Sequence, residues 1–263
     1  MRPRLVALGQ GATLFPLPVR AMKAILDQVT GLLYFDGAHQ AGLIAGGVYP
    51  NPLDQGADVF TGSGGKTLSG PQSGMICWND SALTSGVMKT IFPGLSASHQ
   101  INRVAALAAA SAEFLEFGSA YMRQTVANAQ ALAKALADRG FTVLGEQRGF
   151  TQTHQVLLDT RSFGAGQPAA RRLEQGNVIV SQIALPSDSA RPSAPPGGIR
   201  IGTVEITRLG MFGEHMPEIA DYFHRLLIKG EPPERVRRDV IEFRSAFQNL
   251  YYCFDGGLPL PPG

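Results

Sequence analysis

The sequence contains few cysteines and few histidines, and this scarcity excludes several classes of protein. Among 263 residues there are two cysteines, Cys77 and Cys253, and five histidines. None of them has the short, repeated spacing that disulfide frameworks or metal-ligating motifs show. The sequence therefore predicts neither a disulfide-stabilised fold nor a metal site.

Excess charge and long apolar runs are also lacking. The net charge is +2 with the basic residues scattered, which gives no surface for nucleic acid. No run approaches the length of a membrane span. The apolar LVAL near the N-terminus breaks at Gly9 and is too short for a signal peptide, so we interpret it as a buried strand. We expect a cytoplasmic protein with a small-molecule partner, no nucleic acid and no membrane.

What is present is an ordinary core-forming composition with three short apolar runs close together. Hydrophobic residues make up 44% and charged residues 17% of the chain, enough for a large core or for one domain and a smaller companion. The runs are Leu32–Phe35, Ala57–Thr61 and Met75–Trp78, each bounded by turn-forming residues. Continuous short apolar runs are typical of strands covered on both faces, so the pattern predicts a largely parallel sheet of the α/β class.

Two residues with useful chemistry follow the first two runs. Asp36 ends one, and Lys66 lies in the glycine-rich turn after the other, thirty residues later. Ligands of such sheets bind beyond the carboxyl ends of the strands, so both side chains are predicted to reach one crevice. Pyridoxal phosphate needs a lysine amine to bind it covalently and an acid to keep its pyridine nitrogen protonated. Lys66 and Asp36 suit these two roles.

The residues alone leave alternatives open. Asp36 could cap a turn and Lys66 could be a solvated loop lysine, because both residue types are usually exposed. The GSGGKT segment also suggests a phosphate-binding P-loop. That motif requires a glycine at the position of Phe60, and Gly62 leaves too short a loop.

Several motifs, in order, resemble the serine hydroxymethyltransferases and the related threonine transaldolases and aldolases, which are fold-type I pyridoxal phosphate enzymes. The motifs are DGAHQAGLIAGGVYPNP, GADVFTGSGGKTLSGP with Lys66, FPG at 92–94 and GIRIGT at 198–203. The resemblance implies that Lys66 bonds covalently to the cofactor, that Asp36 pairs with the pyridinium, and that His39 lies beside the ring. Ser63, where the family usually has threonine, is implied to contact the cofactor. Arg200 is implied to bind the substrate carboxylate.

The resemblance also implies a domain organisation. Residues 1–116 are expected to form the C-terminal part of a pyridoxal phosphate-binding large domain with a mostly parallel sheet. Residues 117–263 are expected to form a small C-terminal α+β domain. Within the first domain, the pattern predicts a strand at 4–8, a helix at 19–29 and later a long helical segment that Gly118 interrupts or bends.

In the second domain the pattern predicts short strands and a positioned arginine. The strands are FTVL, HQVLLD and NVIVS, with a helix before the third, and an exposed loop at 186–198. Ile199 and Ile201 alternate with Arg200, so a strand there puts the isoleucines on one face and the guanidinium on the other. A guanidinium so placed can bind a carboxylate through two parallel hydrogen bonds, and the alternative is an ordinary surface salt bridge.

The sequence departs from the resembled family in ways that bear on function. Family members carry a further part of the cofactor domain ahead of the segment that matches this chain, so this chain is expected to lack part of the pocket. Ile183 lies where the family commonly has an asparagine facing folate, which leaves tetrahydrofolate use open. The expected function is serine/glycine interconversion through a glycine quinonoid. The alternatives are a folate-independent threonine transaldolase or aldolase, and a non-catalytic fragment or half of a split enzyme. A homodimer, or a partner chain supplying the missing part, is implied.

Overall fold

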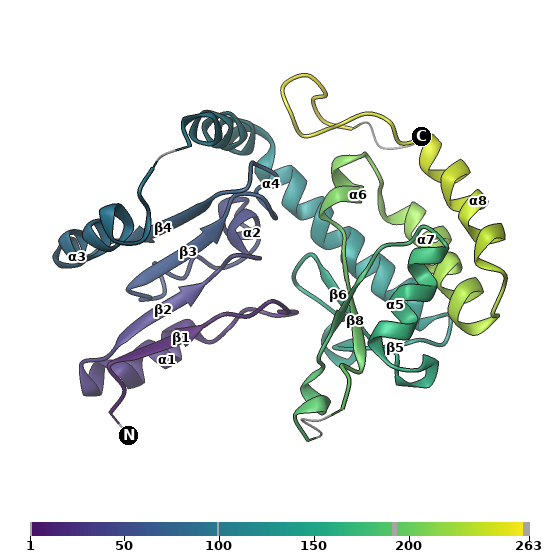
Figure 1. Ribbon diagram of the computed structural model, residues 1–263, viewed down its shortest axis with the longest axis horizontal. Helices are drawn as coiled ribbons and strands as arrows, with labels where there is room; N and C mark the ends of the chain where they lie inside the picture. The colour runs from purple at the N-terminus through teal and green to yellow at the C-terminus, as the bar shows by residue number, and fades with distance from the viewer. Residues whose placement is uncertain (1, 99, 191–193, 260–263) are drawn as a thin grey trace. The chain divides into compact units, whose positions relative to one another are not determined.

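The computed structural model describes residues 2–98, 100–190 and 194–259, and for residues 189 and 190 it describes the backbone alone. The chain divides into two compact units, Met1–Ser119 and Ala120–Gly263. Each unit contains a four-stranded sheet (Figure 1).

The sheet of the first unit has its strands in chain order. They are β1 (Leu5–Leu8), β2 (Leu32–Asp36), β3 (Val59–Ser63) and β4 (Gly74–Trp78). The first three run parallel, whereas β4, the third of the predicted apolar runs, pairs antiparallel with β3. The physical reason is the connection, because the short segment between β3 and β4 cannot make the crossover that a parallel pair requires.

Two helices cover one face of this sheet. They are α1 (Val19–Leu26), extended by a 3-10 turn at Asp27–Val29, and α2 (Ala41–Ala45) (Figure 1). Leu33 and Phe35 of β2 are 0% exposed, and Phe60 of β3 is also buried. The helix predicted at 19–29 is thus confirmed, and Val19 and Leu26 are its buried residues.

The opposite face is not fully covered by the described residues, which corrects the expectation of a sheet buried on both sides. Leu5, Leu32 and Ile76 on that face are 57%, 40% and 38% exposed. The short helix α3 (Thr84–Lys89), between helical turns at Ser81–Leu83 and Thr90–Leu95, borders a groove on this face beside Val59 and Ile76. The strands carry apolar residues on both faces, but the described part of the chain covers only one face fully.

The long helix α4 (Ile101–Ala137) runs through Gly118 without a break, so the predicted interruption there was wrong. A single glycine costs a helix only about 1 kcal/mol relative to alanine. A Cβ at Gly118 would lie 2.3 Å from the ring of Phe114. The glycine therefore makes room for the Phe114 ring.

The second unit is an α+β layer, as predicted. Its sheet is antiparallel, in the order β5-β6-β8-β7, from β5 (Thr142–Val143), β6 (Gln155–Asp159), β7 (Ser181–Ile183) and β8 (Gly198–Gly202). Its remaining helices are α5 (Gly166–Gln175), α6 (Val204–Arg208), α7 (Met216–Phe223) and α8 (Pro233–Ser245). Short helical turns lie at Glu146–Arg148, Arg161–Phe163, Pro186–Ala190, Gly213–His215 and His224–Ile228.

One predicted strand of this unit begins later than expected. The NVIVS segment was predicted to be extended from residue 177, but β7 begins at Ser181. Asn177 has a φ of 65°, and the Val178 N–H donates to the Leu173 carbonyl at 2.9 Å. Residues 177 and 178 therefore close the C-terminus of α5, a local interaction that competes with strand formation.

The core of the second unit lies between its sheet and α4, α5 and α7. Leu158 of β6, Ile199 of β8 and Leu136 of α4 are each 0% exposed.

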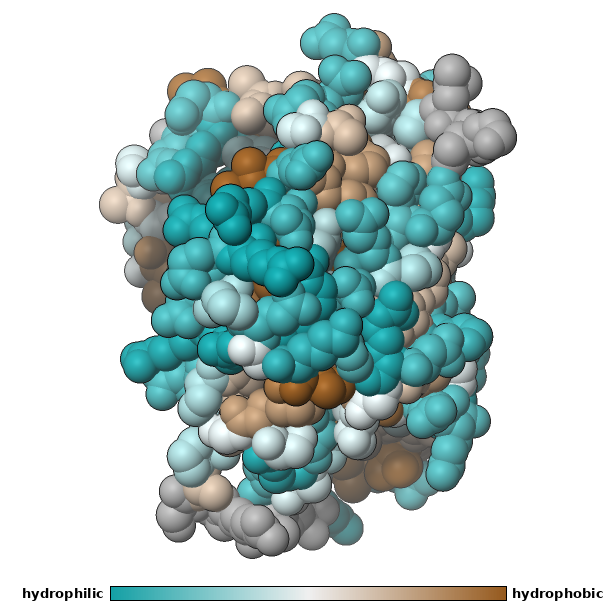
Figure 2. All heavy atoms as spheres, turned by 90° about the vertical axis from the view of Figure 1, so that its right-hand side faces the viewer, coloured by the Kyte–Doolittle hydropathy of each residue, from teal (hydrophilic) through white to brown (hydrophobic). Residues whose placement is uncertain are grey.

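The side of the molecule on which α7 and α8 lie in Figure 1 is mostly hydrophilic, with small hydrophobic areas (Figure 2). Among the described residues, no helix combines the length and the apolar character needed to cross a membrane.

Candidate active site

Polar side chains gather where β2 and β3 end. Asp36 is the last residue of β2 and pairs in register with Thr61, two residues before the end of β3 at Ser63. The Gly37 N–H continues the pairing by donating to the Thr61 carbonyl at 2.9 Å. Because side chains alternate along a strand, Asp36, Thr61 and Ser63 share one face of the sheet. The hydroxyls of Tyr34 and Thr61 are 2.8 Å apart on the same face.

The carboxylate of Asp36 is held by its own turn. Its Oδ1 accepts a hydrogen bond from the Ala38 N–H at 3.0 Å. Gly9, in the loop after β1, approaches so closely that a Cβ there would lie 2.2 Å from the Asp36 carbonyl, and its φ is +125°. Only glycine satisfies both conditions without strain. Asp36 is thus a half-buried acid at a tightly packed strand end.

Lys66 projects from a hydrogen-bonded loop between β3 and β4. The Gly64 N–H donates to the Ser73 carbonyl and the Gly70 N–H to the Gly64 carbonyl, both at 2.9 Å. The Ser69 N–H donates to the Lys66 carbonyl at 2.9 Å, closing a turn around the lysine. Lys66 itself is exposed. The structure gives its ammonium no acidic partner among the described residues, so its amine is available for chemistry.

Thr67 connects the lysine turn to the segment that follows Asp36. Its side chain is 1% exposed. Its hydroxyl accepts from the Gly42 N–H at 2.8 Å and donates to the His39 carbonyl at 3.1 Å. A Cβ at Gly42 would lie 2.2 Å from the Thr67 carbonyl oxygen, so the two segments are in direct backbone contact. The Thr67 hydroxyl is therefore a hydrogen-bond junction between two segments. Lys66 directly precedes Thr67, and the His39 carbonyl accepts the Thr67 hydrogen bond.

The structure thus places four of the five predicted site residues at one end of one sheet. These are Asp36, His39, Ser63 and Lys66, all in the first unit. The sequence reasoning missed Thr67, although the GKT triplet places a hydroxyl residue next to the lysine and could have indicated it.

Arg200 belongs to the second unit, at the centre of β8. It lies opposite Leu157 of β6 and Ser181 of β7. Ile199 and Ile201, on the other face, are 0% and 7% exposed, which confirms the predicted alternation. Burial lowers the pKa of the half-buried Arg200 guanidinium. A cation that is already partly desolvated is suited to bind a small anion.

Known proteins resemble this chain in sequence and in fold. The family model "Serine hydroxymethyltransferase" matches residues 1–223. A serine hydroxymethyltransferase from Korarchaeum cryptofilum is 45% identical over 258 residues, covering 97% of this chain and 59% of that protein. One from Thermococcus gammatolerans is 42% identical over 265 residues, covering 99% of this chain and 62% of that protein.

A solved structure extends the likeness to the fold. The L-threonine transaldolase from Pseudomonas fluorescens, in its internal aldimine state, superposes with a TM-score of 0.87 at 32% identity, covering 96% of this chain and 57% of that chain. The fold is therefore that of the fold-type I pyridoxal phosphate transferases. This chain spans about three fifths of the length of the curated relatives it matches. On the family match and these identities, the chain belongs to the serine hydroxymethyltransferase family.

Proposed function

We propose that this chain binds pyridoxal phosphate at the carboxyl ends of β2 and β3 and acts on β-hydroxy-α-amino acids, interconverting serine and glycine. Family membership supports the class of reaction. The observation that carries the assignment to these residues is the Thr67 junction, which joins the Lys66 turn to the His39 segment beside Asp36.

The residues present fit this cofactor. The Lys66 amine has no ion-pair partner in the described part of the chain. Asp36 uses one carboxylate oxygen on its own turn, and the described residues leave the other without a hydrogen-bond partner. The site thus has an amine for an aldehyde and an acceptor for a protonated ring nitrogen. When bound, pyridoxal phosphate supplies an electron-accepting ring that stabilises the charge left when a bond to Cα breaks.

Each side chain then has a defined task. Lys66 would hold the cofactor covalently through its amine. Asp36 would accept a hydrogen bond from the ring N–H and, as a neighbouring negative charge, would keep that nitrogen protonated. His39 and the Ser63 hydroxyl would help to hold the cofactor. Arg200 binds the substrate's carboxylate through two parallel hydrogen bonds.

Reductive trapping tests the cofactor assignment. The chain is incubated with pyridoxal phosphate, reduced with borohydride and mapped by peptide mass. We expect the adduct on the peptide containing Lys66, its loss in Lys66→Ala, and its retention in Lys89→Ala, a control that removes an exposed lysine of α3. An adduct that forms equally well in Lys66→Ala would refute the assignment.

A second candidate function is a folate-independent threonine transaldolase or aldolase. The solved threonine transaldolase supports it, and so does Ile183 in β7, an apolar side chain where the family commonly has an asparagine. The two functions differ in their requirements. Product from serine only with tetrahydrofolate supports hydroxymethyl transfer, whereas product from threonine and an added aldehyde without folate supports the alternative.

We also propose that the chain works with a second polypeptide, as a homodimer or with a chain that supplies further cofactor contacts. The open apolar face of the first sheet supports this, because parallel sheets are normally covered on both sides. Pyridoxal phosphate trapping is therefore carried out on the chain alone and on the chain mixed with the segment of a relative that this chain does not match. Adduct yield that does not change with the second polypeptide, in a chain that sediments as a monomer, would contradict the proposal. Cytoplasmic location remains a prediction from the sequence.

A further inference from the structure

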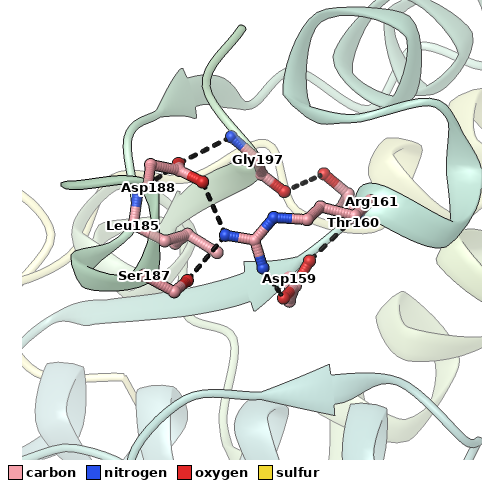
Figure 3. A network of polar contacts seen from close by, with 7 residues as sticks. All are labelled: Asp159, Thr160, Arg161, Leu185, Ser187, Asp188 and Gly197. Carbon is pink, nitrogen blue, oxygen red and sulfur yellow. Dashed lines mark hydrogen bonds and ion pairs between the residues drawn. The ribbon is translucent and has the colours of Figure 1, made fainter. Parts of the chain in front are cut away.

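A network of charged groups closes the base of the loop that leads into β8 (Figure 3). Arg161, just after β6, bonds to Asp188 and Ser187 through Nη2 at 2.5 and 2.6 Å. Its Nη1 pairs with Asp159, whose other oxygen accepts the Arg161 N–H at 3.0 Å. One guanidinium therefore holds two carboxylates that come from different parts of the chain.

Asp188 joins the two ends of the loop. Its Oδ2 accepts the N–H groups of Leu185 and Gly197, each at 2.8 Å. A Cβ at Gly197 would lie 2.7 Å from Nε of Arg161, so the guanidinium packs directly against the backbone there. The Thr160 N–H donates to the Gly197 carbonyl at 2.9 Å. The backbone is thus fixed three residues before Arg200.

Asp159 lies on the same side of the sheet as Arg200. Arg200 is directly opposite Leu157, and Asp159 is two residues further along β6. Diagonal neighbours on one face of an antiparallel pair are about 7–8 Å apart, within reach of an arginine side chain. A carboxylate at that distance competes with a substrate carboxylate for the Arg200 guanidinium, unless another cation engages it.

We propose that Arg161 is a positioning residue for substrate binding: it engages Asp159, which shares the face of Arg200, and through Asp188 it fixes the backbone that enters β8. This inference rests on the proposed role of Arg200 in binding the amino acid's carboxylate. Arg161 does not touch the substrate. It acts through the charge that it neutralises and the backbone that it holds.

Binding measurements separate positioning from general damage. In the form of the protein that binds cofactor in the trapping experiment, glycine and serine affinities are read from the change in cofactor absorbance. We expect Arg161→Ala to weaken amino-acid binding by about tenfold or more, with cofactor affinity nearly unchanged. Arg171→Ala, which removes an exposed arginine of α5, is the matched control and should bind as the wild type does.

A second substitution distinguishes competition from loss of structure. Arg161→Ala combined with Asp159→Asn removes the competing charge, so amino-acid affinity should recover in part. If Arg161 had a purely structural role, amino-acid affinity would not recover, because the double variant lacks both partners of the Arg161–Asp159 ion pair. No recovery, or equal losses of cofactor and amino-acid binding in Arg161→Ala, would overturn the proposal.

Two further readouts keep this test distinct from that of the proposed function. If Arg200→Ala leaves amino-acid affinity unchanged, the role proposed for Arg200 fails, and the inference that depends on it fails with it. If Arg200→Ala weakens binding and Arg161→Ala does not, only the present inference fails. Amide hydrogen exchange needs no cofactor: Arg161→Ala should speed exchange at residues 197–202 and not in α4. Unchanged exchange at 197–202 overturns the inference.

Discussion

At the scale of single residues, the candidate site depends on groups that do no chemistry. Asp36 and Lys66 belong to different strand ends, and Thr67 is the buried side chain that joins their segments. Gly42 allows the backbone contact between these two segments, and Gly9 allows the loop after β1 to approach Asp36, since a Cβ at either would lie 2.2 Å from a carbonyl oxygen. The residues proposed to react could be singled out in the sequence because their chemistry is distinctive. The supporting residues could not, because a threonine or a glycine has many uses.

Replacing Thr67 with valine tests this support. The variant keeps the shape but leaves the Gly42 N–H and the His39 carbonyl without their partner, so we expect a loss of about 1–3 kcal/mol in unfolding free energy. Trapping of pyridoxal phosphate at Lys66 should also fall, because the turn is no longer tied to the His39 segment. Urea unfolding and adduct yield measure the two effects.

Thr142→Val is the matched control for this variant. Thr142 is an exposed residue of the short strand β5, so the same change should stay within about 0.5 kcal/mol of the wild type. Equal effects at both positions would show that the buried hydroxyl of Thr67 has no special role.

At the scale of elements, connections decide what strand patterns leave open. The short connection makes β4 antiparallel to β3, and the closure of α5 delays the start of β7 to Ser181. Asp188 holds Leu185 and Gly197, on either side of the segment before β8, close together. The Gly197 N–H, the Arg161 guanidinium and the Leu185 N–H, in that order of effect, lower the pKa of Asp188 to about 2, from an ordinary value of 3.8.

This shift predicts an acid-sensitive contribution to stability. Because the folded-state pKa lies below the unfolded one, the contribution is fully present above about pH 4 and is lost as pH falls towards 2. Asp188→Asn should be less stable than the wild type at neutral pH, and the difference between the two should shrink as pH falls through this window. Urea midpoints measured from pH 6 to pH 2 report it.

The control for the acid experiment is Asp255→Asn, which changes an exposed aspartate of the C-terminal segment. Its midpoints should follow those of the wild type at every pH. A constant difference between Asp188→Asn and the wild type across the whole range would mean that the Asp188 charge is not what the loop requires.

At the scale of the whole molecule, the chain holds two compact units with separate cores. The only tryptophan in the sequence, Trp78, lies on β4 in the first unit. Its fluorescence therefore reports the first unit, whereas far-ultraviolet circular dichroism reports both. Units with separate cores can unfold in separate transitions.

Leu158→Ala should reveal whether they do. Leu158 is 0% exposed in the core of the second unit, and its truncation is expected to cost about 2–5 kcal/mol. We expect the circular dichroism transition to move to lower urea, while the Trp78 fluorescence midpoint stays in place. A fluorescence midpoint that moves equally would show that the units unfold together.

The sequence by itself determined the fold class, the main helices and the α+β character of the second unit, and it indicated the residues proposed to react. These follow from local signals: apolar periodicity, turn residues, and side chains whose chemistry has few substitutes. Only the tertiary structure decided the direction of β4, the open face of the first sheet, the Thr67 junction and the hold of Arg161 on Asp159 and Asp188. The open face, the Thr67 junction and the Arg161–Asp188 pair depend on groups that are distant in the sequence, and no local pattern predicts their contacts.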